Sequence, residues 1–493
     1  MRVWRWFGLA TSGLVLVACG PPWQPVEGGL AFPDESVGPS DLALERSPAA
    51  DARPLFPDAS AGDLSVSEPA RDAAVDGQSA PVDEAMSIDE AMPADAAIPT
   101  DQSWPEYALD PPLDDLLGVD LTAQACPGFL PATRWPVGAW NTTVMAVGDV
   151  NGDGNADLVV PDYSGGGTVS VVLGDGKGGF KEDLEVPGVA GLAALGDFNG
   201  DKLLDLAAFG GGISVLPGRG DGTFRAPLVL KVNPSTGYFA AGDFNNDGKL
   251  DLATSACGEN AQMQPADGWV SVFLGKGDGT FGPGSDLPGG SDPNAIALAD
   301  FNRDGAVDLA VASDDYKECS IRIFLGDGKG GFLPPAVVSA GCKTGVRNLE
   351  VADMNHDGIA DLVGTAGDVD ILVLLGKGDG TFLPGAGSSV ADPNLVLGTG
   401  GIAVGDLDRD GNPDVATTVA GYFIMNFVGT YYSYVAVSYG DGKGGLKPPV
   451  ICQIDYWPEP IRAVDLNHDG KLDLVTYIAR RGGAGVLEVL LGK

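Results

Sequence analysis

A nine-residue acidic loop recurs seven times in this chain. We number the copies loop 1 to loop 7, and the positions within each copy 1 to 9. Oxygens at positions 1, 3, 5 and 9 and a backbone carbonyl at position 7 can converge on one hard cation, while glycine at position 6 permits the sharp turn between them. The copies are Asp149–Asp157, Asp197–Asp205, Asp243–Asp251, Asp300–Asp308, Asp353–Asp361, Asp406–Asp414 and Asp465–Asp473.

Calcium fits such a loop better than magnesium, because a flexible oxygen cage with few waters suits the larger ion. A single copy fits a metal-free, Asx-rich turn equally well. Seven copies in register favour calcium. The predicted ligands are Asp149, Asn151, Asp153, Asn155, Asp157, Asp197, Asn199, Asp201, Asp205, Asp243, Asn245, Asp247, Lys249, Asp251, Asp300, Asn302, Asp304, Ala306, Asp308, Asp353, Asn355, Asp357, Ile359, Asp361, Asp406, Asp408, Asp410, Asn412, Asp414, Asp465, Asn467, Asp469, Lys471 and Asp473, where position 7 contributes its carbonyl.

The seven loops differ in their predicted affinity for a cation. In loop 2, Lys202 replaces the glycine at position 6, which adds a Cβ where a positive φ is expected and places a positive charge beside the site. We expect loop 2 to bind most weakly. Loop 6 has a fourth carboxylate, Asp408, and is expected to bind more tightly, although Pro413 can strain its turn.

The elements that position these loops are short strands. The loops follow one another at intervals from 46 residues, between Asp197 and Asp243, to 59 residues, between Asp406 and Asp465. Four β-type runs surround each loop, and glycine-rich turns such as Gly275–Phe281 supply the positive φ that a tight hairpin needs. Four antiparallel strands repeated seven times predict an all-β fold, a seven-bladed β-propeller over residues 121–493.

The two ends of the repeat region predict how the ring closes. The last unit stops at Lys493, before the segment that opens the fourth strand in most other units. That segment occurs at the front instead, where Gly128–Pro131 matches Gly331–Pro334. We therefore expect the N-terminal segment to add the outer strand of the last blade, because an open array would expose strand edges at both ends.

The recurring Asp-x-Asn-x-Asp-Gly-x-x-Asp-Leu loop and the later Leu-Gly-x-Gly-Asp-Gly-x-Phe turn resemble the FG-GAP/VCBS repeat family, which includes the integrin α-subunit propeller. The resemblance covers about residues 126–493. It implies a seven-bladed propeller with calcium in the loops between the first and second strands, serving adhesion or ligand recognition. Some members are lectins and others are attached to enzymes, so the family does not fix the ligand.

The N-terminal part of the chain is predicted to export and anchor the protein. Residues 1–18 combine two arginines with an apolar run too short to span a bilayer, as in a signal peptide, and Leu16-Val-Ala-Cys19 resembles a lipoprotein cleavage site with Cys19 as the lipidated residue. An ordinary signal peptide with a chance cysteine is the alternative. Gly20 provides no inner-membrane retention signal, which favours the outer membrane.

Residues 19–120 are predicted to be a disordered acidic tether. They are rich in Pro, Ala, Ser, Asp and Glu and show no sustained hydrophobic period, so they bury too little apolar surface to offset the ordering entropy. A small folded domain is the alternative.

Composition argues against nucleic acid as a partner and against catalysis. The formal net charge of -39 repels a polyanion. The chain contains no Gly-x-Ser-x-Gly or His-Glu-x-x-His stretch, and its two histidines, His356 and His468, stand at position 4 of their loops, where they are expected to be solvated. We predict that the protein is not an enzyme. A carboxylate-pair hydrolase remains the alternative.

Five cysteines follow Cys19 in a chain predicted to reach an oxidising compartment. A hairpin folded about Gly326–Gly331 brings Cys319 and Cys342 together, so we predict a disulfide between them. The pairing of Cys126, Cys257 and Cys452 is left open, and one of these must stay unpaired within the chain.

The predicted function is adhesion or ligand recognition by a calcium-stabilised, membrane-anchored propeller, with an unknown protein or glycan as the ligand. A lectin-like module, a purely structural envelope protein and a glycan-active enzyme are the alternatives. In an up-and-down blade, the connections between strands 2 and 3 and between successive blades lie on the face opposite the acidic loops. In this chain these connections vary most between repeats and carry many aromatic residues, which is typical of a recognition surface. The candidate ligand residues on that face are Trp135, Trp140, Trp269, Tyr316 and Trp457.

Overall fold

The computed structural model describes residues 126–493 except 140–141, 143, 163–166, 210–211, 231–235, 260–264, 292, 314–318, 343–344, 367–369, 391–395, 426–427, 455–456 and 480–484. The predicted signal peptide, Cys19 and the predicted tether lie outside the described residues, as do Trp140 and Tyr316. Strands and turns make up the described part of the chain, which contains no helix. No helix there is long and apolar enough to cross a membrane.

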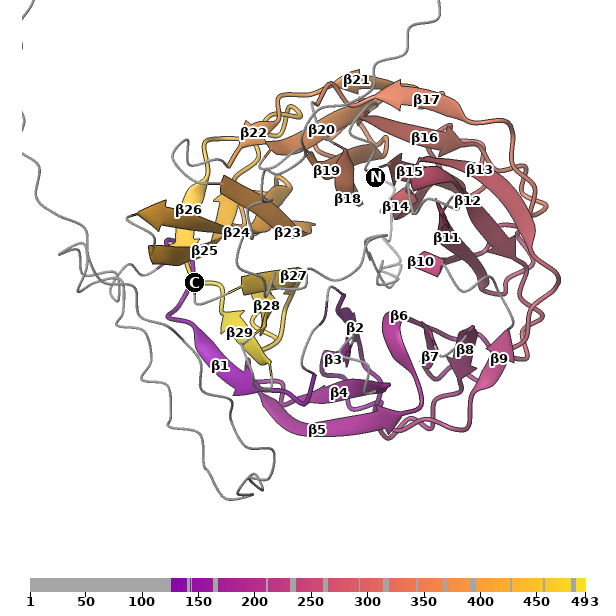
Figure 1. Ribbon diagram of the computed structural model, residues 1–493, viewed down its shortest axis with the longest axis horizontal. Coiled ribbons are helices and arrows are strands. Elements are labelled where there is room, and N and C mark those ends of the chain that lie inside the picture. The colour runs from indigo at the N-terminus through magenta and orange to yellow at the C-terminus, as the bar shows by residue number, and fades with distance from the viewer. Residues whose placement is uncertain are drawn as a thin grey trace, which may run out of the picture. The chain divides into compact units, whose positions relative to one another are not determined.

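Seven antiparallel sheets form a ring, and each sheet is one blade of a β-propeller (Figure 1). The predicted all-β, seven-bladed fold is confirmed. In blades 1 to 6, consecutive strands lie side by side from the innermost to the outermost. Blades 1 to 3 comprise β2 (Ala146–Gly148), β3 (Asp157–Pro161), β4 (Thr168–Gly174) and β5 (Phe180–Pro187); β6 (Ala190–Gly196), β7 (Asp205–Phe209), β8 (Ile213–Leu216) and β9 (Leu228–Leu230); and β10 (Thr236–Gly242), β11 (Asp251–Glu259), β12 (Pro265–Phe273) and β13 (Ser285–Ser291).

Blades 4 to 6 repeat this order, with one additional short strand in blade 5 that pairs with the third strand of its sheet. They comprise β14 (Pro293–Ala299), β15 (Asp308–Ser313), β16 (Ser320–Phe324) and β17 (Ala336–Ser339); β18 (Val346–Ala352), β19 (Asp361–Ala366), β20 (Asp370–Gly376), β21 (Phe382–Pro384) and β22 (Ser388–Ser389); and β23 (Val396–Gly405), β24 (Asp414–Met425), β25 (Val428–Ser438) and β26 (Val450–Gln453).

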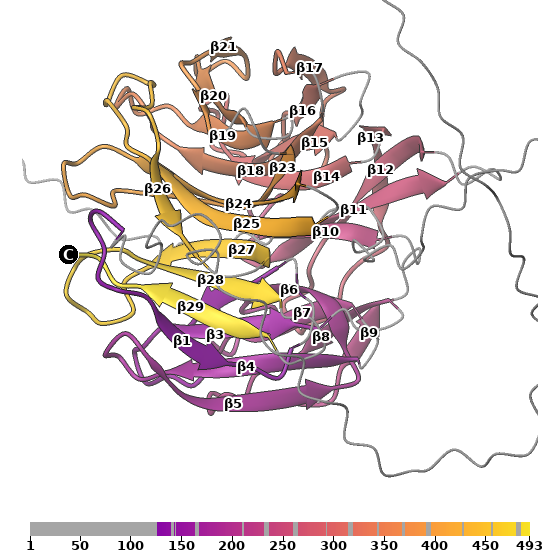
Figure 2. The same cartoon turned by 60° about the vertical axis from the view of Figure 1, so that its left-hand side comes forward.

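Blade 7 combines both ends of the propeller. Its inner strands are β27 (Trp457–Val464), β28 (Asp473–Ala479) and β29 (Val486–Leu490), and β1 (Thr133–Pro136) pairs antiparallel with β29 as the outer strand (Figure 2). Just before β1, Phe129 forms a bridge with Gly492, as Phe332 does with Gly326 in blade 4. The predicted closure through the N-terminal segment is confirmed.

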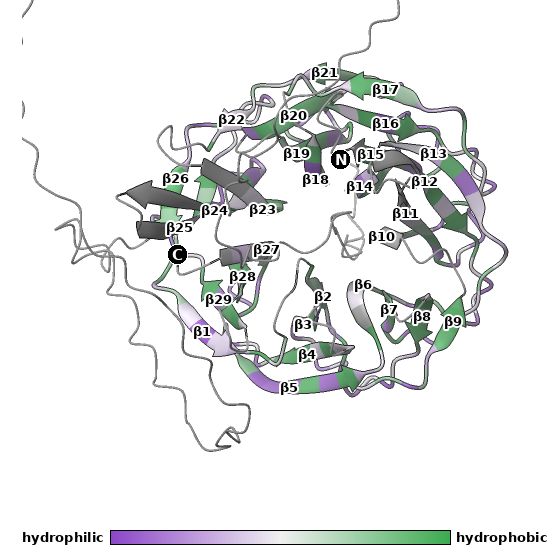
Figure 3. Cartoon of the chain, viewed as in Figure 1, coloured by the Kyte–Doolittle hydropathy of each residue, from purple (hydrophilic) through white to green (hydrophobic). Residues whose placement is uncertain are grey.

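Burial explains why the middle strands are mostly apolar. Each sheet lies between two neighbouring blades, so both of its faces are covered, and every residue of β3, β8 and β29 is buried. The outermost strands are exposed on their outer side, and β5 therefore exposes its charged residues while Leu184 and Val186 are half-buried (Figure 3). The hydrophobic pattern thus follows the distance of a strand from the edge of the ring.

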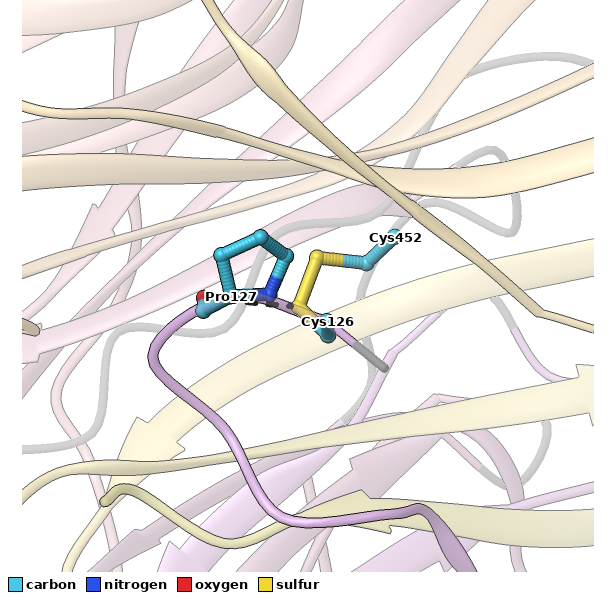
Figure 4. Close-up of a disulfide and its surroundings, with 3 residues drawn as sticks. All are labelled: Cys126, Pro127 and Cys452. Carbon is cyan, nitrogen blue, oxygen red and sulfur yellow. Dashed lines mark hydrogen bonds between the residues drawn. A yellow bond between two sulfur atoms is a disulfide. The ribbon is translucent and has the colours of Figure 1, made fainter. Parts of the chain in front are cut away.

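Two disulfides lie in the described residues. One joins Cys319 to Cys342 across the β16–β17 hairpin, which is the pair that the hairpin geometry predicts. The second joins Cys126 to Cys452, at a sequence separation of 326 residues (Figure 4). Because Cys452 lies in β26, this second disulfide attaches the closing segment of blade 7 to blade 6.

The hairpins between the second and third strands differ in length. They lie on the face opposite the acidic loops, which precede the second strand of each blade. In blade 6, β24 has 12 residues and β25 has 11, whereas β3 of blade 1 has 5. Blade 3 also has an extended hairpin, since β11 and β12 each have 9 residues.

Candidate metal centres

Each acidic loop is folded around its own side-chain oxygens. In loop 1, the Asp149 carboxylate accepts the backbone N–H groups of Asp153 at 3.1 Å and Gly154 at 2.9 Å. The Asn151 side-chain oxygen accepts the same Asp153 N–H at 2.8 Å, and the Asp153 carboxylate accepts the N–H of Asn155 at 2.9 Å. These bonds bring the oxygens at positions 1, 3 and 5 to the inside of one turn.

Two residues of each loop have a left-handed backbone. At position 6, the glycines have φ from 76° to 90°, and Lys202 of loop 2 has φ 70°, as its substitution for glycine predicts. The sequence interpretation missed position 4, which is also left-handed in all seven loops. Its residues are Gly152, Gly200, Asn246, Arg303, His356, Arg409 and His468, with φ between 56° and 79°.

Position 9 is a buried aspartate that fixes the loop to the blade. Asp157 accepts the N–H of Val150, at position 2, at 2.9 Å and the N–H of Gly174, which ends the third strand, at 2.8 Å. Its counterparts make the same two bonds. Burial raises the pKa of each of these carboxyls, and it raises that of Asp414 to about 6. The seven buried aspartates are Asp157, Asp205, Asp251, Asp308, Asp361, Asp414 and Asp473.

Loop 6 departs from this pattern and offers the clearest cation site. One carboxylate oxygen from each of Asp406, Asp408 and Asp414 lies within 4.8 Å of the others. The Asp410 N–H donates to Asp408 rather than to position 1, which leaves a buried oxygen of Asp406 without a hydrogen-bond partner. A buried, unsatisfied oxygen beside two further carboxylates matches the ligands that a hard divalent cation requires.

Loop 2 is the least suited to a cation. The side-chain nitrogen of Asn199 donates to the position 9 carboxylate, Asp205, at 3.0 Å, whereas in loops 1, 4 and 5 the position 3 asparagine donates to position 5. Lys202 adds its positive charge and a Cβ at a left-handed position. Both features agree with the expectation that loop 2 binds most weakly.

Lysines contact position 5 in several loops. The Lys181 ammonium lies 2.8 Å from Asp153, and this hydrogen bond is the main reason that the pKa of Asp153 is lowered to about 2. Lys249 and Lys471 make similar contacts with Asp247 and Asp469 at 3.2 Å and 3.3 Å. Each ammonium group balances part of the loop's charge, so a cation bound there competes with it for the position 5 carboxylate.

Both histidines are exposed, as expected, and each also contacts the neighbouring blade. His356 Nε2 lies 2.9 Å from Oδ1 of Asn412, and His468 Nε2 lies 3.0 Å from Oδ1 of Asn155. In each case the partner is the position 7 asparagine of the next loop around the ring. No signal within one repeat indicates this contact, because the two residues belong to different blades.

Three of the five aromatic residues predicted for the opposite face lie in the described part of the chain, and all three belong to strands rather than loops. Trp135 belongs to β1, and its ring meets Phe180 of blade 1 edge-on with ring centroids 6.0 Å apart. The placement of Trp135 in a ligand-facing loop is therefore wrong, because its ring packs at the junction of blades 7 and 1. Trp269 is partly buried within β12, and Trp457 is the first residue of β27.

Comparison with known families supports the repeat assignment. Four segments match the FG-GAP-like repeat, at residues 149–208, 197–254, 261–311 and 300–364. No curated protein matches the chain.

Among solved structures, the chain is similar to BBS1N, described in complex with ARL6DN. The two are 14% identical, and the match covers 74% of this chain and 97% of that chain at a TM-score of 0.45. It is also similar to the Dos1 propeller, with 12% identity, 68% of this chain and 74% of that chain covered, and a TM-score of 0.40.

Proposed function

We propose that this protein is a non-catalytic propeller whose acidic loops bind calcium and whose opposite face recognises a ligand. An FG-GAP β-propeller is consistent with a non-enzymatic ligand-binding module. The observation that carries the calcium proposal is the unsatisfied, buried oxygen of Asp406 beside Asp408 and Asp414.

Calcium would be held by the oxygens at positions 1, 3 and 5, by the carbonyl at position 7 and by the carboxylate at position 9. When bound, it would neutralise carboxylates that otherwise repel one another across each loop. Because position 9 also holds the N–H groups of position 2 and of the glycine-rich turn, order gained at the cation extends into two strands of the same blade. Calcium is therefore proposed as a stabiliser of the ring rather than as a reactant.

The first prediction concerns removal of calcium. Chelation should lower the melting temperature, since a ligand at a thousand times its Kd stabilises the folded state by about 4 kcal/mol per site. Thermal unfolding with calcium, with magnesium and with excess chelator measures the effect. Equal melting under all three conditions contradicts calcium binding. Asp408→Asn, which restores the residue found at this position in the other loops, should lower calcium affinity only modestly.

The opposite face is proposed to recognise a protein or glycan at the bacterial envelope. The hairpins between the second and third strands are longer in blades 6 and 3 than in blade 1, so this face differs from blade to blade. Trp269 lies in the hairpin of blade 3. Recognition surfaces commonly consist of variable connections on a rigid scaffold. Once a screen of envelope glycans and proteins yields a ligand, Trp269→Ala should weaken its binding. Unchanged binding places the ligand elsewhere on the ring.

We also propose export and lipid anchoring at Cys19, supported by the sequence of residues 1–19. Attachment through several acyl chains is stable, whereas one chain gives only marginal membrane binding. The second prediction is that Cys19→Ser releases the protein from the outer-membrane fraction. Fractionation of cells that express each form measures this, and persistence of the variant in membranes contradicts a lipid anchor at this residue.

A further inference from the structure

The acidic loops are connected to one another across the blade boundaries. The backbone carbonyl at position 2 of one loop accepts an N–H from a glycine in the glycine-rich turn of the next blade. In blade 6, the Gly444 N–H donates to Met354 of loop 5 at 3.0 Å. The equivalent pairs are Gly178 with Leu466, Gly222 with Val150, Gly279 with Phe198, Gly330 with Phe244 and Gly380 with Phe301.

Where position 4 is a histidine, its side chain adds a second contact between the same two blades. The His356 ring reaches from loop 5 to the position 7 residue of loop 6, where its Nε2 lies 2.9 Å from the Asn412 oxygen. The Asn412 amide covers Gly442 of the glycine-rich turn so closely that a side chain at Gly442 would collide with it. His468 repeats the contact on Asn155 across the closure between blades 7 and 1.

The asparagine in each pair occupies the position whose carbonyl is a predicted calcium ligand. The Asn412 N–H donates to the Asp410 carboxylate at 2.9 Å, so its backbone is already tied to another predicted ligand. The hydrogen bond between His356 and the Asn412 side chain therefore restricts the Asn412 backbone, whose carbonyl is the predicted calcium ligand. Ligands held in place before binding give higher affinity, because less conformational entropy is lost.

We infer that cation sites of this ring are completed from the neighbouring blade, and that His356 of blade 5 is a positioning residue for the site in blade 6. His468 of blade 7 serves the site in blade 1 in the same way. The inference rests on the proposed calcium binding by the loops. It makes adjacent sites dependent on the packing of blades, so the affinity of one loop is set partly by a residue outside its own repeat.

Blade 6 contains an internal reporter for testing this inference. Tyr439 directly precedes Gly440, whose N–H donates to the Asp414 carboxylate at 2.8 Å, so Tyr439 lies beside loop 6. The equivalent position is leucine in five other blades, at Leu173, Leu274, Leu325, Leu375 and Leu491. Terbium bound at loop 6 should therefore show luminescence sensitised by Tyr439, and Tyr439→Leu should remove that contribution.

The variant His356→Gly removes the contact without disturbing the backbone, since glycine already occupies position 4 in loops 1 and 2 at φ 73° and 79°. We expect it to weaken the Tyr439-sensitised terbium binding about fivefold, as for the loss of one hydrogen bond. Asn412→Ala keeps the backbone carbonyl and should weaken binding at least as much, because it also removes the hydrogen bond of the Asn412 side chain to Asp410. The double variant should bind no more weakly than Asn412→Ala, because that change already removes the histidine contact.

His468→Gly is the matched control and should leave the Tyr439-sensitised affinity unchanged. The melting temperature without metal should be the same for both histidine variants, which separates positioning from a general loss of stability. Equal terbium affinity in the full-length protein and His356→Gly overturns the inference while leaving cation binding intact. Absence of terbium binding to the full-length protein, by luminescence and by calorimetry, overturns the proposed function itself.

Discussion

At the scale of single residues, two left-handed positions decide which side chains an acidic loop accepts. Position 6 is glycine in six loops, and position 4 accepts Gly, Asn, His or Arg. Asparagine and histidine tolerate this backbone better than most residues, whereas a long side chain adopts it at a cost. Lys202 is the one departure from glycine at position 6, so loop 2 carries strain at this position that the other six loops avoid there.

The third prediction is that Lys202→Gly stabilises the protein. Relief of the left-handed strain should raise the free energy of unfolding by about 1 kcal/mol. Loss of the ammonium group should at the same time increase the affinity of loop 2 for calcium. Urea unfolding measures the first effect. The reverse change in loop 1, Gly154→Lys, should destabilise by a similar amount, and an unchanged midpoint for both variants contradicts the assignment of strain.

At the scale of the element, the innermost strands carry a ring of small residues with two exceptions. The residue three places before each loop is a buried alanine in five blades: Ala146, Ala194, Ala240, Ala297 and Ala403. In blades 5 and 7 it is Glu350, on β18, and Arg462, on β27. Burial raises the pKa of Glu350 to about 7, and the positive charge of Arg462 opposes this rise.

The fourth prediction concerns the pH dependence that follows from Glu350. Its pKa lies above the ordinary value of 4.5, so the folded state takes up a proton before the unfolded state as pH falls. The cost of the buried charge is therefore fully present above pH 7 and is relieved between about pH 7 and 4.5. From pH 8 to pH 5, the protein should gain up to about 3 kcal/mol relative to Glu350→Gln. Urea unfolding with calcium measures the difference, and parallel curves contradict it.

The sequence predicts the strands and the loops well because their signals lie within one repeat. Seven copies of an acidic loop and a glycine-rich turn determine strand number, blade number and the closing segment. Contacts between blades have no such signal, since each depends on two residues in different repeats whose relative positions only the ring defines. The sequence therefore predicts His356 to be solvated, which its exposure confirms, but gives no signal for its contact with the next blade. It places Trp135 in a loop, although this ring packs against the next blade.

At the scale of the whole molecule, the ring holds together through one repeated junction. The apolar residue at position 2 of a loop lies against the aromatic residue of the next blade's glycine-rich turn, as in the pairs Phe198–Phe281 and Phe244–Phe332. Phe129 supplies the corresponding aromatic ring for blade 7, where it shares a buried cluster with Leu407 of loop 6. The N-terminal segment therefore contributes a core residue as well as a strand.

The last prediction is that the disulfide at this junction stabilises the ring more than the disulfide within blade 4. Cys126–Cys452 closes a chain segment with a sequence separation of 326 residues, whereas Cys319–Cys342 closes one of 23. The loss of chain entropy on cross-linking the unfolded state grows with the length enclosed, which gives about 6 kcal/mol for the first disulfide and about 3.5 kcal/mol for the second.

Replacing both cysteines of each pair by alanine tests this order. The variant without Cys126 and Cys452 should show the larger fall in the free energy of unfolding. It should also show faster proteolysis near residues 126–136, because the closing segment then keeps its strand pairing and packing but loses its covalent attachment to blade 6. The variant without Cys319 and Cys342 should keep that segment protected, because its disulfide spans a single hairpin. An equal or reversed order of stability would show that the closing segment is secured mainly by its strand pairing and by the packing of Phe129.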